Sequence, residues 1–113
     1  MHEISIAEDL SAIVLEVANR EKLSKVTKVN IRFGEMIQIV PEIFEFAFRE
    51  IVRNTLIREA EIFIEIVPVK MRCHNCGNDF QVTGNNFSCN ICTSTDLEII
   101  SGRELIIKSI EGE

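Results

Sequence analysis

The sequence predicts an α+β fold: a small mixed sheet that carries two helices, with a four-cysteine zinc ribbon projecting between two antiparallel strands. Three observations predict this fold. Two segments repeat apolar residues at helical spacing, three segments alternate apolar and polar residues, and the four cysteines form two C-x-x-C pairs. A chain of 113 residues, 46% of them hydrophobic, is long enough for one domain with a small appendage.

Residues 5–23 predict the first helix. Their apolar stripe consists of Ile6, Leu10, Ile13, Val14 and Val17. Ser5 and Glu8 have the S-x-x-E spacing of a capping box, which satisfies the first free amides of a helix. We therefore expect this helix to start at Ser5, directly after the first few residues.

Residues 25–34 predict a half-buried strand that ends at Gly34, because Val29, Ile31 and Phe33 alternate with polar residues. Pro41 suits the first position of a second helix, where the missing N–H has no helical partner. The expected buried stripe of that helix is Phe44, Ala47, Phe48 and Ile51. The phenylalanines at 44, 46 and 48 indicate core and interface rather than a ligand pocket.

The alternating segment 60–72, "AEIFIEIVPVKMR", predicts a strand of up to a dozen residues, with 102–111, "GRELIIKSIE", as its mate. Residues 73–100 lie between them and contain all four cysteines. This composition does not build an apolar core. We therefore expect an α/β domain of residues 1–72 and 101–113, and a metal-held ribbon domain of residues 73–100.

The two cysteine pairs are Cys73 with Cys76 and Cys89 with Cys92. A C-x-x-C turn directs two thiolates at one centre, and two facing turns complete a tetrahedron. Gly77 permits the left-handed backbone that such a turn often needs. The pattern predicts one site of four thiolates with zinc as the metal. Because all four ligand positions come from protein, the expected role of the zinc is structural.

Other uses of these cysteines are less favoured. Iron in a rubredoxin-like centre uses the same ligands, but nothing near the pairs indicates electron transfer. A thioredoxin-like site needs one C-x-x-C pair at a helix start, whereas this chain has two pairs in an irregular segment. His74, inside the first pair, is either a solvated turn residue or an alternative or outer ligand of the metal. The spacing does not distinguish the two.

Charge and composition exclude several classes of function. The net charge of −6 disfavours nucleic acid as a partner, although a zinc-ribbon module that binds protein or nucleic acid remains the alternative function. No apolar run spans a membrane and no export signal opens the chain, so paired cysteines indicate a reducing, cytoplasmic location. We find no nucleophile–base pair or phosphate loop, and we expect no enzyme activity.

The first three residues form a possible chelate. The Met1 amine and the His2 amide nitrogen close a five-membered ring on a metal, and the His2 amide and imidazole Nδ1 close a six-membered ring. The Glu3 amide nitrogen could also bind. A planar array of nitrogens suits Ni(II) and Cu(II). By spacing alone, a histidine at position two is also common by chance.

The chain as a whole resembles the HypA/HybF family of nickel-incorporation proteins in [NiFe]-hydrogenase maturation. The resemblance rests on the following stretches: "MHEISIAEDL", "VTKVNIRFGE", "VPEIFEFAF", the paired C-x-x-C motifs and "LEIISGRELIIKSIE". It implies a metallochaperone whose nickel-binding domain is the α/β domain defined above. Unlike some relatives, this chain has only His74 near the cysteine pairs, which weakens any expectation of pH sensing at the zinc.

The resemblance also implies site residues and partners. His2 would be the principal Ni(II) ligand, supported by main-chain nitrogen of Met1 and Glu3, and the four cysteines would match the family's structural zinc ligands. The implied partners are a HypB-type GTPase, the hydrogenase large subunit and, in some relatives, proteins of the urease pathway.

Overall fold

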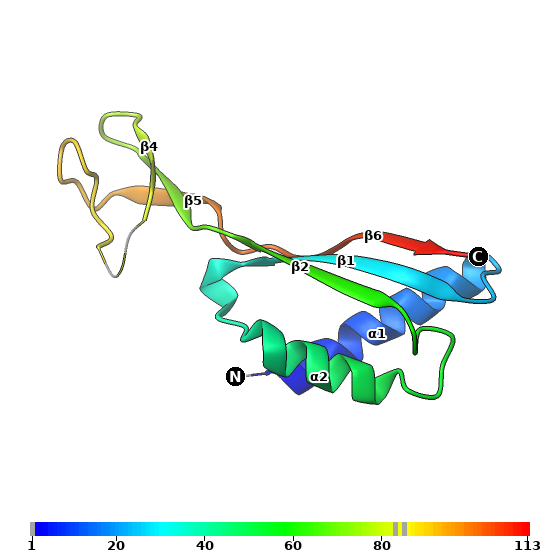
Figure 1. The fold of residues 1–113 in the computed structure, drawn as a ribbon. Helices are drawn as coiled ribbons and strands as arrows, with labels where there is room; N and C mark the ends of the chain where they lie inside the picture. The colour runs from blue at the N-terminus through cyan, green and yellow to red at the C-terminus, as the bar shows by residue number, and fades with distance from the viewer. Residues whose placement is uncertain (1, 83, 85) are drawn as a thin grey trace.

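The computed structural model describes residues 2–82, 84 and 86–113, and consists of an α/β unit and a projecting ribbon. The molecule is elongated, with extents of 54 × 26 × 17 Å (Figure 1). The α/β unit contains α1 (Glu3–Arg20), β1 (Val26–Gly34), η1 (Glu35–Ile37), α2 (Pro41–Ile51), β2 (Glu61–Val67) and β6 (Leu105–Gly112). The ribbon contains β3 (Lys70–Cys73), β4 (Asp79–Gln81) and β5 (Leu97–Ser101). The α+β class expected from the sequence is confirmed.

The sheet of the α/β unit is mixed and has the order β2-β1-β6. β1 lies in the centre, parallel to β2 and antiparallel to β6. Both helices cover the same face of this sheet (Figure 1). The three apolar residues of β1 that alternate, Val29, Ile31 and Phe33, are buried on that face. The strand predicted at 25–34 is therefore confirmed, including its end at Gly34.

Two expectations about the later strands are wrong. The strand expected over 60–72 is interrupted at Pro68 and Val69, so that it forms β2 and β3 in two different sheets. Proline has no N–H to donate to a sheet, so a break there is favourable. The expected mate of β2 was the segment 102–111, but β6 pairs with β1 instead. The antiparallel pair that leads into the ribbon is β3 with β5.

The first helix also differs from its prediction. It begins at Glu3 with His2 as its N-cap residue, and the His2 side chain makes no capping hydrogen bond. Ser5 and Glu8 lie inside the helix, so the expected capping box is wrong. The buried face uses smaller residues than the predicted stripe, because Ala7, Ser11 and Ala18 are buried whereas Ile13 is exposed.

The second helix begins at Pro41 as predicted. Phe44, Ala47 and Phe48 are buried, and the Phe44 ring meets Phe33 of β1 edge to face at 5.0 Å. Phe46 is not a core residue, because 72% of it is exposed. Within the expected stripe, Ile51 is exposed, at 37%.

Two connecting segments, at residues 68–69 and 101–102, join the ribbon to the α/β unit and lie against each other. The Ser101 hydroxyl donates to the Pro68 carbonyl at 3.0 Å, and the Val69 N–H donates to a Glu35 carboxylate oxygen at 3.3 Å. At Gly102, with φ +111°, an added Cβ would lie 2.8 Å from the Val69 Cα. An added Cβ on Gly34 would overlap the Gly102 carbonyl. The connection is therefore hydrogen-bonded and close-packed.

Candidate metal centres

The four cysteine sulfurs lie together at the far end of the ribbon. All four Sγ atoms are within 4.8 Å of one another, with Cys73 to Cys92 at 3.5 Å and Cys76 to Cys89 at 3.6 Å. A tetrahedral zinc with Zn–S bonds of about 2.3 Å separates its sulfurs by about 3.8 Å. The donor set and its spacing therefore fit a single tetrahedral thiophilic metal. Cys73 and Cys89 are buried, whereas Cys76 is exposed.

The two cysteine turns have the same hydrogen-bond pattern. The N–H of the residue four positions after the first cysteine donates to that cysteine's carbonyl: Gly77 to Cys73 at 2.8 Å, and Thr93 to Cys89 at 3.0 Å. Both donors have positive φ, +77° for Gly77 and +63° for Thr93. The left-handed turn expected at Gly77 is confirmed. The equivalent turn at Thr93 has no sequence signal, because a β-branched residue rarely adopts this conformation.

Hydrogen bonds to sulfur favour the thiolate form. The Cys92 and Ile91 N–H groups donate to the Cys89 sulfur at 3.5 and 3.4 Å, and lower the pKa of Cys89 to about 6. The Asn75 amide donates to the Cys92 sulfur at 3.5 Å and lowers the pKa of that thiol. Thiolate is the form that binds metal, so these contacts favour metal binding at Cys89 and Cys92, whereas the pKa of Cys76 is raised to about 12 in the absence of a metal.

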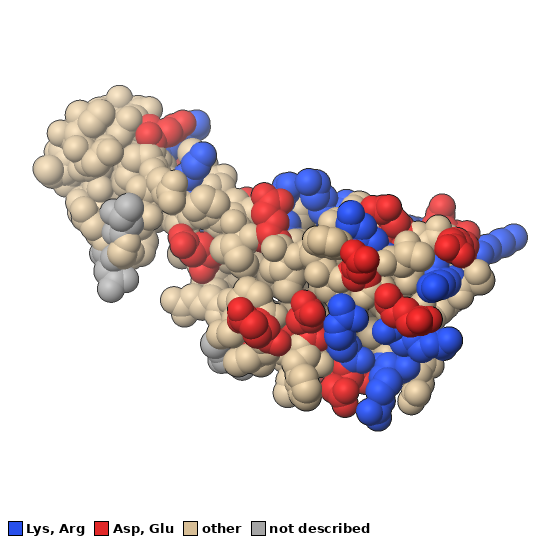
Figure 2. Space-filling view, viewed as in Figure 1, with Lys and Arg blue, Asp and Glu red and all other residues tan. Residues whose placement is uncertain are grey.

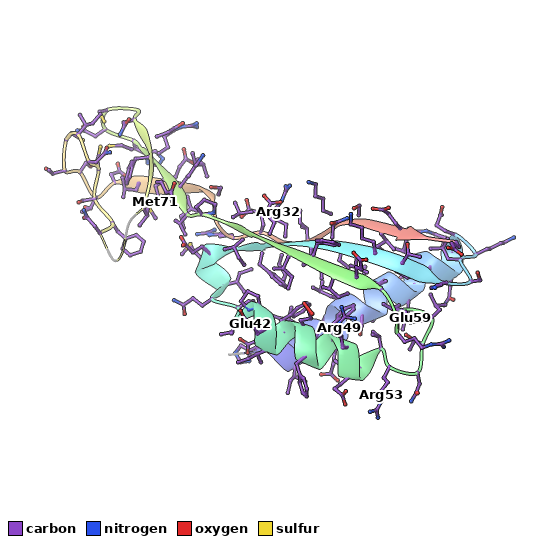
Figure 3. The ribbon with its side chains drawn as sticks, viewed as in Figure 1. Arg32, Glu42, Arg49, Arg53, Glu59 and Met71 are labelled. Carbon is purple, nitrogen blue, oxygen red and sulfur yellow. The ribbon has the colours of Figure 1, made fainter. Side chains whose placement is uncertain are left out.

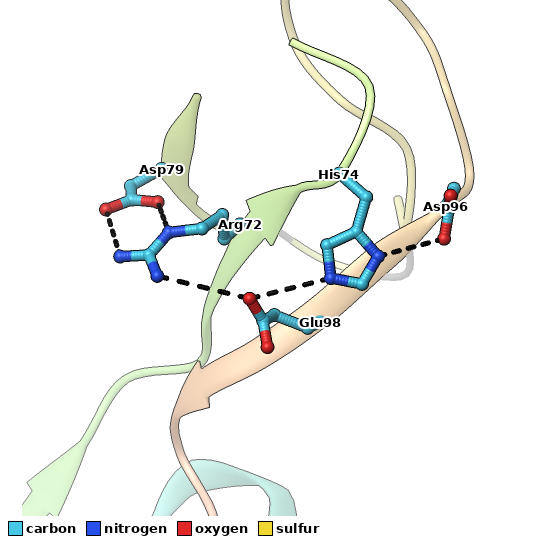
Figure 4. Close-up of polar contacts among 5 residues, drawn as sticks. All are labelled: Arg72, His74, Asp79, Asp96 and Glu98. Carbon is cyan, nitrogen blue, oxygen red and sulfur yellow. Dashed lines mark hydrogen bonds and ion pairs between the residues drawn. The ribbon is translucent and has the colours of Figure 1, made fainter. Parts of the chain in front are cut away.

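His74 belongs to a chain of charged residues on the ribbon surface (Figure 4). Its Nδ1 lies 3.1 Å from Asp96 and its Nε2 lies 3.5 Å from Glu98, so both ring nitrogens face carboxylates. The hydrogen bond with Asp96 raises the pKa of His74. Arg72 continues the chain with two hydrogen bonds to Asp79, at 2.8 and 3.2 Å. This partnership with carboxylates was not among the roles expected for His74.

The amino-terminal residues are held at the start of α1. His2 is exposed, and its carbonyl accepts the first helical hydrogen bond from the Ile6 N–H at 2.9 Å. Glu3 is only 6% exposed, and its carboxylate accepts a hydrogen bond from the Val40 N–H at 3.2 Å. Val40 directly precedes α2, so Glu3 connects the starts of both helices. Sequence reasoning missed this role of the Glu3 side chain. Met1 lies outside the described residues.

Comparison with known proteins decides the family. The family model described as "Hydrogenase/urease nickel incorporation, metallochaperone, hypA" matches residues 1–112. This chain belongs to the HypA family. The hydrogenase maturation factor HypA of Desulfosudis oleivorans is 40% identical over 112 residues, which cover 98% of this chain and 97% of that protein. The Aquifex aeolicus HypA is 33% identical over 113 residues, or 100% and 98% of the two chains.

Solved HypA structures share the fold. The solution structure of the nickel metallochaperone HypA from Helicobacter pylori superposes with a TM-score of 0.70 at 26% identity, and covers 99% of this chain and 97% of that one. A second solution structure of a HypA protein gives a TM-score of 0.74 at 26% identity, with 100% and 97% coverage. The expected membership of the HypA family is therefore confirmed. The chain belongs to a family of nickel-incorporation metallochaperones, and it contains a four-cysteine metal-binding cluster.

In the part of the chain that the structure describes, no helix is both long and apolar enough to cross a membrane.

Proposed function

We propose that this HypA-family chain binds Ni(II) at its amino terminus and delivers it for insertion into the metal centre of a [NiFe]-hydrogenase, while a structural zinc holds the ribbon. The observation that carries the proposal is the start of α1, where an exposed imidazole at His2 precedes main-chain amides fixed by a buried carboxylate. An exposed site suits a metal that must be received and passed on.

The nickel ligands in this proposal are the His2 imidazole and main-chain nitrogens of Met1 and Glu3. The first N–H groups of a helix have no intrahelical acceptor, and the His2 side chain does not cap α1. The Glu3 amide is therefore free of a helical bond that a metal would have to break. Loss of an amide proton leaves negative charge at the helix amino terminus, where the helix dipole favours it.

The zinc in this proposal is held by Cys73, Cys76, Cys89 and Cys92. When bound there, zinc supplies a cross-link between the two turns and no open coordination position for chemistry. The four residues provide thiolates, and Asn75 and the Ile91 and Cys92 N–H groups orient and stabilise those thiolates. The protein binds and transfers a metal in this scheme and catalyses no reaction.

The partners in this proposal are a HypB-type GTPase and the hydrogenase large subunit, with urease-pathway proteins as a further recipient. The family description supports a role in hydrogenase and urease nickel incorporation. The proposed location is the cytoplasm, where free thiols remain reduced for metal binding.

Nickel titration of His2→Ala tests the proposal. His2→Ala should abolish the absorbance of the planar Ni(II) complex, because the imidazole is needed with any set of main-chain nitrogens. His74→Ala is the matched control, since His74 is the only other histidine, and should bind nickel as the wild type does. Unchanged affinity in His2→Ala, or loss in His74→Ala, would contradict the site.

A second variant tests the free amine. A Gly-Ser extension before Met1 converts that amine into an amide and should disrupt nickel binding without changing zinc content. Binding should also weaken as the pH falls, because protons compete for the imidazole and the main-chain nitrogens. Nickel affinity that does not depend on the extension would remove Met1 from the ligand set.

A further inference from the structure

A patch of exposed apolar side chains lies beside the amino terminus. We call it the Phe46 patch, and its members are Ile4, Ile43, Phe46 and Ile51, with exposed fractions of 65%, 51%, 72% and 37%. With Ala47 and Glu50 they line a groove of about 240 Å³. Such a cluster of large apolar side chains typically marks an interaction site.

The patch follows the spacing of a second helix stripe on α2. Ile43, Phe46, Ala47 and Glu50 stand at positions i, i+3, i+4 and i+7, whereas the core side of α2 uses Phe44 and Phe48. A stripe with this spacing packs against another helix, ridge into groove. Ile4, in the first turn of α1, lines the groove together with this stripe. The stripe therefore offers an exposed apolar face of the kind that packs against a further helix.

The charges around the patch decide what kind of helix fits. Glu42, Glu45 and Glu50 lie on α2, and Glu8 is one helical turn from Ile4. Two of these glutamates pair with nearby arginines, Glu45 with Arg49 at 3.4 Å and Glu50 with Arg53 at 3.7 Å, so the acidic excess beside the patch comes from Glu42 and Glu8. Figure 3 shows Glu42 at the start of α2, with Arg49 and Arg53 towards and beyond its end.

The same asymmetry is visible on the surface. Figure 2 shows acidic side chains over the first half of α2 and a mixture of acidic and basic ones near its end. The chain carries a net charge of −6, so a second copy would bring the same acidic rim against this one. Like charges across an interface suppress association, whereas a basic partner is attracted.

We propose that the Phe46 patch receives an amphipathic helix of a partner protein, with apolar side chains in the groove and lysine or arginine beside the glutamates. The partner helix would lie next to His2, because Ile4 of the patch is only two residues after His2 in the sequence. Glu3, between them, also connects the start of α1 to Val40 before α2. A role of this partner helix in nickel transfer rests on the proposed function, whereas its docking on the Phe46 patch does not.

A synthetic helical peptide tests the docking directly. The probe contains leucine at i, i+3, i+4 and i+7 and lysine elsewhere, and the matched peptide has glutamate in place of lysine. In NMR titrations the lysine peptide should shift the amides of Ile4, Ile43 and Phe46, and salt should weaken it. Phe46→Asp should weaken binding by about tenfold or more. Ile106→Asp, at an apolar residue of β6 that is 44% exposed, is the control and should change it little.

Three results would overturn the inference. They are equal binding of the glutamate peptide, amide shifts that map away from the Phe46 patch, and a protein dimer in sedimentation that Phe46→Asp dissociates. The last result would identify a second copy as the occupant.

Two further measurements separate this inference from the proposed function. Phe46→Asp should bind nickel as the wild type does, and wild-type protein that binds no nickel would reject the nickel site while the peptide result still decides the docking. If the cognate GTPase binds wild type and Phe46→Asp equally, the docking inference is wrong and the GTPase remains a partner. If the GTPase binds neither protein, it is rejected as a partner, and the peptide titration decides whether the Phe46 patch receives a helix.

Discussion

The α/β unit and the ribbon bury very different amounts of apolar surface. Among the described residues, the core cluster of the α/β unit contains fourteen buried residues, including Phe33, Phe44 and Phe48. The cluster of the ribbon contains six, and two of these are the metal-site cysteines Cys73 and Cys89. Because hydrophobic stabilisation scales with the apolar area removed from water, we expect the first unit to fold on its own core and the ribbon to depend on a bound metal.

The largest expected effect is in the ribbon. Cys89→Ser removes one of four thiolates and should unfold residues 70–101, because metal binding at such sites contributes roughly 10 kcal/mol of folding free energy. Hydrogen exchange by mass spectrometry should show lost protection in β3 and β5 and retained protection in α1 and β1. Loss of protection throughout the chain would mean that the two units fold together.

A change in the core of the α/β unit should destabilise that unit and leave the metal site of the ribbon intact. Phe44→Ala deletes a ring that packs on Phe33 and Phe48, and should cost about 3–5 kcal/mol of unfolding free energy. Zinc content should stay at the wild-type value. Phe46→Ala is the matched control, with an expected change within about 0.5 kcal/mol because Phe46 is exposed. Urea unfolding followed by circular dichroism measures both variants.

The connection between the two units gives an intermediate effect. Gly102→Ala forces a side chain into positive φ and against Val69, and should cost about 1–3 kcal/mol. Gly84→Ala is the comparison, because Gly84 also has positive φ but its added Cβ would meet nothing within 4 Å. If both variants lose the same stability, backbone conformation rather than the close approach to Val69 is responsible.

The smallest effect concerns the surface charges of the ribbon. Arg72 lowers the pKa of Asp79, chiefly through their hydrogen bond. The pair therefore stabilises the ribbon while Asp79 is ionised, and this contribution is lost as the pH falls through the lowered pKa. In Arg72→Ala, Asp79 should begin to protonate at higher pH, as measured by carboxyl NMR of zinc-loaded protein. Exposed pairs contribute little, so thermal stability at neutral pH should barely change. An Asp79 titration that does not move would remove Arg72 as the cause.

The sequence by itself determined several of the elements and the four-cysteine cluster. The strand at 25–34, the helix start at Pro41 and the cysteine cluster follow from local patterns, because alternation, proline geometry and C-x-x-C turns depend on neighbours in the chain. The start of α1 at Glu3 did not follow, since Ser5 offered a local capping signal that the helix does not use.

Only the tertiary structure decided which strands pair and what the side chains of Glu3, His74 and Phe46 contact. β6 pairs with β1 rather than with β2, and alternation carries no information about partners because every half-buried strand shows it. Glu3 binds Val40 and His74 binds Asp96, contacts between residues far apart in the sequence. The exposure of Phe46 likewise depends on which side of α2 meets the sheet, and that orientation is fixed by packing of the whole core.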